Sequence, residues 1–176
     1  MRIPSRWRRR MAGGVLASAV ALGGCWYNTS GRSGANVGDI YLPFFQDQTT
    51  GDRAANLGTR LTERVVREFQ RDRNIRVYQA AAERSLAQKE LLGTVRRFTE
   101  GVLNRNVNQT TEEYRVVIEC SVSYKDLQGD RMLWQSGVSG DGNYQLSEGD
   151  VGFQRAVDEA LDEILSQIVD KTIKAW

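Results

Sequence analysis

The chain has 176 residues, of which 40% are hydrophobic, and these values suit one globular domain with a modest core. No apolar run reaches the roughly 18 residues of a membrane-spanning helix. Histidine is absent and the two cysteines lie far apart, so the commonest general base and any Cys/His metal cluster are excluded, and we expect no cofactor.

The small excess of basic residues comes from the N-terminus. Five arginines fall within the first ten residues, whereas the first acidic residue is Asp39. Without residues 1–24, 19 basic residues remain against 22 acidic ones. We therefore expect no nucleic-acid partner.

Residues 1–24 have the layout of a signal peptide, with a basic start, a short apolar stretch and small residues at the end. The stretch Leu22-Gly23-Gly24-Cys25 resembles the lipobox of bacterial lipoproteins. In that class the cysteine carries lipid and becomes the first residue after cleavage, and two or more acyl chains hold a protein stably on a membrane. Cys25 is thus the predicted lipidation site; the alternative is a plain secreted protein. By the same resemblance, Trp26 points to the outer membrane.

Residues 25–37 are small and polar and are predicted to form a flexible tether, followed by a folded domain over 38–176. The stretch 39–45 predicts a strand that is an edge strand or has a bulge at Pro43. A helix is expected over 54–70, with Thr50 or Asp52 available as its cap. Its apolar stripe consists of Leu57, Leu61, Val65 and Phe69.

Further along, 75–78 predicts a short strand and 79–89 a loop or one helical turn. Another strand should begin near Glu90 and run to about Leu103. The clearest strand is 114–125, because apolar and mostly polar residues alternate along it. This alternation makes Cys120 a small buried residue, since its face offers no basic partner for a reactive thiol.

The segment 126–130 predicts a hairpin turn with Gly129, and 131–140 a strand with Met132, Trp134 and Val138 on one face. Ser147 and Asp150 have the spacing of a capping box before a final helix. The apolar side of that helix consists of Phe153, Val157, Leu161, Ile164, Leu165, Ile168 and Ile173. The order β-α-β-β-β-β-α predicts an α+β, two-layer sandwich, in which two helices cover a mainly antiparallel sheet of four to five strands.

With these elements placed, the chain resembles the LptE family of lipopolysaccharide-assembly outer-membrane lipoproteins, from about Gly24 to Trp176. Four features carry the resemblance: an I-x-L-P-x-F-x-D-x-T stretch, the Leu61-Thr62-Glu63 triplet, a strand glycine and a terminal hairpin. Their residues are Ile40, Leu42, Pro43, Phe45, Asp47, Thr49, Gly93, Tyr114, Val116, Ile118, Asp126, Gly129, Leu133 and Trp134.

The resemblance implies a protein anchored by its lipid to the periplasmic face of the outer membrane. It implies a plug in an LptD-type β-barrel, which the protein helps to assemble, and a role in carrying lipopolysaccharide to the cell surface. It implies neither a reaction nor a cofactor.

Lipopolysaccharide carries phosphates, which Lys and Arg would bind. Lys125 and Arg131 flank the predicted hairpin turn, and a second basic group consists of Arg96, Arg97 and Arg105. These five are the speculative lipopolysaccharide contacts; the alternative for each is an ordinary solvated surface charge.

Two other hypotheses remain open. An LpoB-like lipoprotein that regulates a peptidoglycan synthase also opens with a strand, an F-x-[ND]-x-T loop and a helix. An enzyme would need acid and base groups, for which Glu112, Glu113 and Asp141 are the candidates, but no nucleophile with a base is visible beside them.

Overall fold

The computed structural model describes residues 38–51, 53, 55–71, 75–105 and 112–173, and of residues 104, 105 and 112 it describes the backbone alone. The predicted signal peptide, the predicted tether and Cys25 lie outside these residues, as does the possible cap Asp52.

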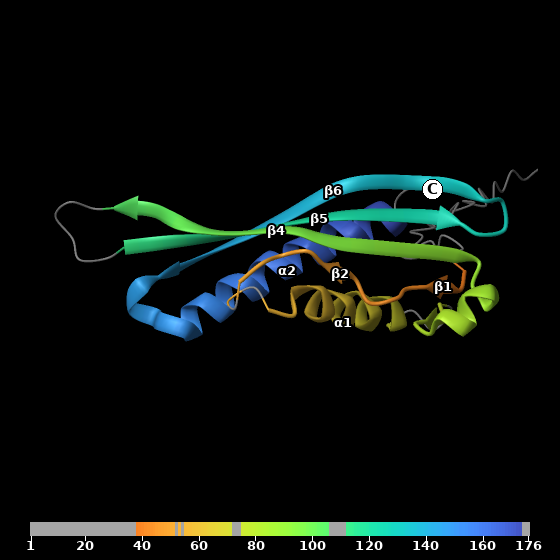
Figure 1. Ribbon diagram of the computed structural model, residues 1–176, viewed down its shortest axis with the longest axis horizontal. Helices are drawn as coiled ribbons and strands as arrows, with labels where there is room; N and C mark the ends of the chain where they lie inside the picture. The colour runs from red at the N-terminus through yellow and green to blue at the C-terminus, as the bar shows by residue number, and fades with distance from the viewer. Residues whose placement is uncertain (1–37, 52, 54, 72–74, 106–111, 174–176) are drawn as a thin grey trace, which may run out of the picture. The chain divides into compact units, whose positions relative to one another are not determined.

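Six strands in this part of the chain form one mixed sheet in the order β3–β1–β4–β5–β6, with β2 paired to β4 (Figure 1). The long antiparallel strands are β4 (Lys89–Arg105), β5 (Glu112–Asp126) and β6 (Arg131–Gln145). Three two-residue strands pair in parallel: β1 (Ile40–Tyr41), β2 (Gln46–Asp47) and β3 (Val77–Tyr78). The predicted α+β class with a mainly antiparallel sheet is confirmed, and the sheet also has a parallel portion.

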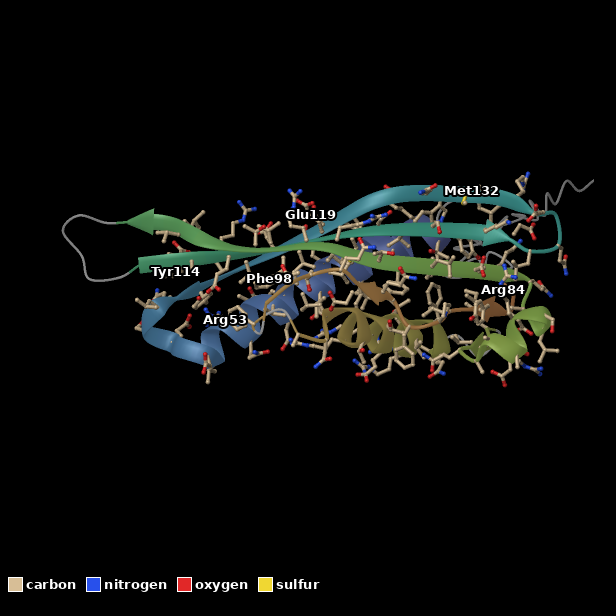
Figure 2. The ribbon with its side chains drawn as sticks, in the orientation of Figure 1. Arg53, Arg84, Phe98, Tyr114, Glu119 and Met132 are labelled. Atoms are coloured by element: carbon tan, nitrogen blue, oxygen red, sulfur yellow. The ribbon has the colours of Figure 1, made fainter. Side chains whose placement is uncertain are left out.

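Two α-helices pack on one face of this sheet, α1 (Leu57–Gln70) and α2 (Gly149–Ile173). Two 3₁₀ segments join the elements, η2 (Ala81–Leu86) and η3 (Leu146–Glu148). Side chains alternate across the long strands, so Phe98 points toward the helices while Glu119 and Met132 point away from them (Figure 2).

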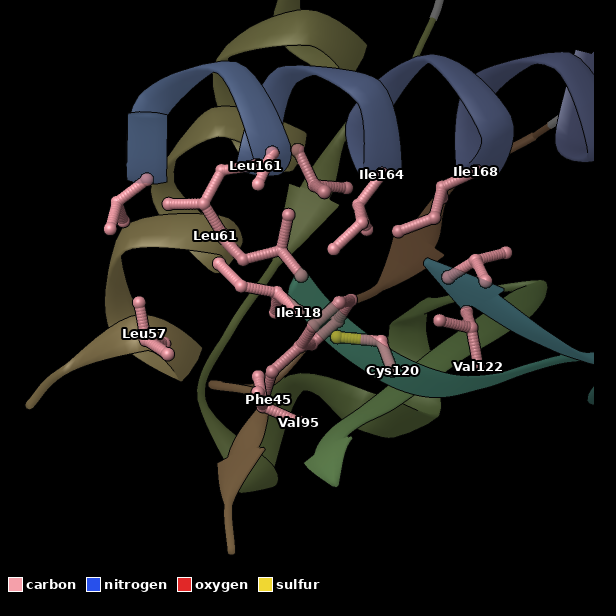
Figure 3. Packing of buried hydrophobic residues seen from close by; sticks show 14 of the residues in the cluster. Phe45, Leu57, Leu61, Val95, Ile118, Cys120, Val122, Leu161, Ile164 and Ile168 are labelled. Atoms are coloured by element: carbon pink, nitrogen blue, oxygen red, sulfur yellow. The ribbon is translucent and has the colours of Figure 1, made fainter. Parts of the chain in front are cut away.

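The core lies between the helices and the inner side chains of β4, β5 and β6. Leu61 of α1 and Leu161, Ile164 and Ile168 of α2 are fully buried against this face (Figure 3). The opposing strand residues include Val95, Ile118, Cys120 and Val122. The predicted apolar stripe of α1 is thus confirmed as core, and so is that of α2 except for Leu165, which is partly buried against the core, and Ile173, which lies outside the core cluster. Burial removes the apolar surface of these stripes from water.

The predicted strand 39–45 is wrong in its continuity, since within it only Ile40–Tyr41 is a strand, β1. Strand β2 follows at Gln46–Asp47, and Pro43 lies in the irregular piece between the two. Phe45, in that piece, packs over Gly93 of β4, where an added Cβ would lie 2.4 Å from the Phe45 ring. The Phe45 amide donates to Thr62 Oγ1 at 2.8 Å. The prediction failed because proline lacks the amide that a continuous inner strand needs.

The start of α1 also differs from the prediction. The helix begins at Leu57, and its N-cap residue Asn56 has a left-handed φ of 64° and makes no capping bond through its side chain. Instead, Asp47 Oδ2 accepts from the Gly58 amide at 3.2 Å, while Oδ1 accepts from the Thr49 amide at 3.0 Å. A carboxylate from β2 therefore satisfies a free amide of the first turn, where negative charge is favourable.

Helix α2 lies unusually close to β6 because two strand positions lack a side chain. An added Cβ at Gly140 would lie 2.0 Å from the Ala160 carbonyl oxygen, and one at Gly142 would lie 2.1 Å from that of Ala156. The glycines of β6 and the alanines of α2 thus let the two backbones meet. This gives a packing role to part of the glycine-rich stretch.

Two predictions near β6 are wrong, whereas the hairpin turn with Gly129 is confirmed, and its residue with a positive φ, of 47°, is Asp130. Met132 lies on the face opposite Trp134, because a bulge opposite Tyr124 and Lys125 shifts the register by one residue. The capping box is made by Gln145 and Glu148 around η3, not by Ser147 and Asp150.

Candidate interaction surface

The sheet face turned away from α1 and α2 is called the open face here. Neither α1 nor α2 covers it, although η2 reaches one end of it through the ion pair of Arg84 with Glu90. Its residues come from alternate positions of the three long strands. Its centre is rich in small hydroxyl residues and glycine. The open-face residues include Leu92, Thr94, Arg97, Thr99, Arg115, Val117, Glu119, Ser121, Ser123, Lys125, Met132, Gln135, Gly137, Ser139 and Asp141.

Charges on the open face are largely paired with one another. The Arg115 guanidinium donates twice to the Asp141 carboxylate, at 2.7 and 3.1 Å, and this bond raises the pKa of Arg115. Arg97 lies 3.7 Å from Glu119, and Lys125 pairs with Asp130. The open face is therefore polar but close to neutral.

The basic residues predicted from the sequence do not form one cluster. Lys125 pairs in register with Met132, and Arg131 with Asp126, so Lys125 and Arg131 occupy the same end of the sheet on opposite faces. Arg131 lies on the face of a largely buried ion pair, in which Lys89 Nζ is 3.0 Å from Asp126 Oδ2.

The second basic group is spread along β4. Arg96 is the extra residue of a bulge, and its guanidinium is 3.4 Å from Gln48 Oε1. Arg97 follows it on the open face. The Arg105 backbone pairs with Glu112, at roughly 26 Å from Arg97 along the strand, and its side chain lies outside the described residues.

Sequence reasoning missed a cluster around Arg53, in the loop before α1. Arg53 Nη1 donates to both carboxylate oxygens of Glu100 in β4, at 2.7 and 2.9 Å, and the guanidinium carbon lies 4.2 Å from the centre of the Phe153 ring. The Tyr144 hydroxyl donates to the same carboxylate. No local signal connects Arg53 with Glu100, because 47 residues separate them.

This cluster ties the loop to the far half of β4 and to the start of α2. Burial opposes the charged form of Arg53, but the Glu100 carboxylate outweighs it and raises the pKa of Arg53. Burial and the bond to Glu100 both raise the pKa of Tyr144. The cluster therefore has a structural role, because the charges of Arg53 and Glu100 neutralise each other.

The groups considered for catalysis are engaged or isolated. Asp141 is paired with Arg115, and the Glu112 side chain lies outside the described residues. Cys120 is 3% exposed, as predicted for a small core residue, and burial raises the pKa of its thiol to about 12. Within the described ranges, no group of three or more Cys, Asp or Glu side chains is placed to hold a metal ion.

The lipopolysaccharide-assembly family model LptE matches residues 37–174, which is most of the chain and all of the described fold. The chain belongs to the LptE family. This is a non-enzymatic family of the lipopolysaccharide transport machinery. No curated protein is similar enough in sequence to count as a relative.

Solved structures share the fold at low sequence identity. A Xanthomonas campestris protein is 15% identical with a TM-score of 0.58, over 78% of this chain and 85% of that one. A Chlamydia trachomatis protein is 13% identical with a TM-score of 0.50, over 78% and 94%. None of the described helices is long and apolar enough to cross a bilayer.

Proposed function

We propose that this LptE-family protein is an outer-membrane lipoprotein that plugs an LptD-type β-barrel, helps it assemble and assists lipopolysaccharide transport to the cell surface. The family match over residues 37–174 carries this proposal. The open face supports it, because the interior of a membrane β-barrel is polar and suits a polar, nearly neutral partner surface.

The proposal includes a lipid anchor on Cys25, which would hold the domain at the periplasmic face of the outer membrane. The test is a Cys25→Ser variant of the full chain. We expect it to leave the membrane fraction and lose most of its activity in lipopolysaccharide transport, because one covalent anchor supplies the membrane affinity. An equally membrane-bound and active variant would contradict the anchor.

The barrel partner is tested by affinity purification of the full chain from membranes in mild detergent. A large β-barrel protein should copurify. If a peptidoglycan synthase copurified instead, the LpoB-like alternative would replace this proposal. Depletion of the protein should also lower both assembled barrel and surface lipopolysaccharide.

The most detailed part of the proposal is direct contact between this protein and lipopolysaccharide. Among the five predicted basic residues, Arg96 and Arg97 are adjacent, exposed and only weakly paired. An Arg96→Gln, Arg97→Gln variant should bind purified lipopolysaccharide several-fold less well, since two phosphate contacts are lost. The matched control is Arg67→Gln, Arg71→Gln, in the last turn and at the C-cap of α1, which removes the same charge elsewhere. Equal binding by both variants would assign Arg96 and Arg97 to ordinary surface charge.

A further inference from the structure

The sheet protects its edges unequally. At β6, α2 covers the edge: Glu163 Oε2 accepts from the Asp141 amide at 3.0 Å, and Gln167 Nε2 donates to the Ser139 carbonyl at 2.6 Å. The opposite side of the sheet ends in β3, which has only two residues. Short strands and side chains on backbone groups are the devices by which proteins blunt a sheet edge.

Strand β4 is different, because it extends beyond β1 and β2, the short strands that pair with it on the side away from β5. Its first half pairs with β1 at Lys89–Glu90 and with β2 at Thr94–Val95. The last backbone bond on this side is from the Gln48 amide to the Val95 carbonyl, at 2.9 Å. From Arg97 to Val102, β4 pairs with β5 on one side, and from Arg97 to Leu103 no described strand pairs on the other (Figure 1).

The unpaired stretch 97–103, here called the β4 edge, has the properties of a docking strand. It is roughly 23 Å long, and it contains neither proline nor lysine. The bulge at Val95/Arg97 lies just before it, and the bulge at Val102/Asn104 leaves its last residue, Leu103, without a partner on β5. Val102 and Leu103 are 42% and 46% exposed, which is unusual for two neighbouring apolar residues in a strand.

The side chains of the β4 edge indicate which kind of extended segment would pair with it. Arg97 is two-thirds exposed at one end and has only the 3.7 Å contact with Glu119. Glu100 is already neutralised by Arg53, so it would not repel an acidic partner. Val102 and Leu103 supply apolar contact at the other end. The complementary partner is an extended segment with an acidic residue opposite Arg97 and apolar residues opposite Val102 and Leu103.

We propose that the β4 edge binds an extended segment of the barrel protein by adding it to the sheet as a further strand. This inference rests on the proposed barrel partner. It adds the site on this chain, and the backbone groups, through which the two proteins would join. A second copy of the chain fits poorly, because antiparallel pairing about Gly101 would bring Arg97 opposite position 105, another arginine.

The test compares two double variants of the full lipidated chain in the affinity purification. Val102→Lys, Leu103→Lys places charge on the β4 edge, and the matched control Leu146→Lys, Val151→Lys places the same charge on exposed apolar residues near the start of α2. We expect the first variant to copurify about tenfold less barrel protein than the unmodified chain does, and the control variant to copurify as much as the unmodified chain. Equal retention would overturn the inference.

Hydrogen exchange gives the second measurement and uses the unmodified chain. Those amides of residues 97–103 that do not already bond to β5 should exchange at least about tenfold more slowly in the barrel complex than in the free protein, because strand pairing protects backbone amides. If the barrel copurifies and these amides exchange equally in both states, the strand inference is wrong while the proposed function stands. If no barrel copurifies, both fail.

Discussion

The two faces of the sheet use the same strands for different purposes. On β5, Val116, Ile118 and Cys120 face the helices and are at most 3% exposed, whereas Val117, Glu119 and Ser121 alternate with them on the open face. The inner residues hold α1 and α2, while the outer residues of β5 are mostly polar and lie on the face away from both helices. The pleat of the strand thus separates the residues that stabilise the fold from those of the proposed recognition surface, so that substitutions on one face should spare the other.

The largest expected effect comes from the closest contact of the inner face. Gly142→Val would place side-chain atoms on the Ala156 carbonyl and push α2 off the sheet, with a loss of more than about 3 kcal/mol in the free energy of unfolding. Denaturant unfolding measures it. Gly137→Val is the control, because a Cβ there has its nearest neighbour at 4.0 Å on the open face. Similar losses in both variants would contradict the close packing of α2.

A cavity in the core should have the next largest effect. Leu161→Ala removes a fully buried side chain of α2 and should cost about 3 kcal/mol. Val117→Ala, on the open face of β5, should cost under about 1 kcal/mol. The difference between the two midpoints of urea unfolding measures the contrast between the faces directly, and comparable values would refute it.

The Arg53 cluster should contribute less. Arg53→Gln removes the ion pair with Glu100 and the contact with the Phe153 ring, and we expect a loss of about 1 kcal/mol because Arg53 is half exposed to solvent. Arg67→Gln is the control, because Arg67 is 63% exposed and lies 3.9 Å from Glu63. Hydrogen exchange should locate the Arg53 effect in the far half of β4; an unchanged rate there would show that the cluster does not tie the loop to β4.

The smallest effect is a pH dependence at Asp47. Burial acts to raise the pKa of this carboxyl, but the hydrogen bonds from Thr49 and Gly58 prevail, so the pKa lies below 3.8. A lowered pKa stabilises the fold when the group is ionised. Its contribution is fully present above about pH 5 and shrinks as the pH falls through and below 3.8. Unfolding of the chain and of Asp47→Asn should therefore differ at pH 7 and converge near pH 2; a constant difference would exclude this linkage.

Local periodicity was enough to predict the long elements. Alternation along 114–125 located β5, and the spacing of Leu57, Leu61, Val65 and Phe69 located α1, because both patterns depend only on neighbouring residues. An irregularity at Pro43 was predictable from the proline itself, whereas the bulge opposite Tyr124 was not, since it depends on pairing with another strand. This is why Met132 was placed on the wrong face.

The candidate surface was predictable to a similar extent. The polar positions of β5 indicated an exposed face, and basic residues could be named from composition. Their grouping could not, because strand register puts Lys125 and Arg131 on opposite faces. The bond from Asp47 to the start of α1, the Arg53 cluster and the unpaired β4 edge all arise between distant segments. They became visible only when those segments were placed side by side.

The separation of the two faces is tested most directly by a pair of charges at the centre of the open face. Ser121→Arg, Ser123→Arg adds bulk and charge where no described helix packs. We predict a thermal midpoint within about 3 °C of the unmodified chain and loss of most of the copurified barrel. A barrel retained in full by this stable variant would contradict the account of the open face as the recognition surface.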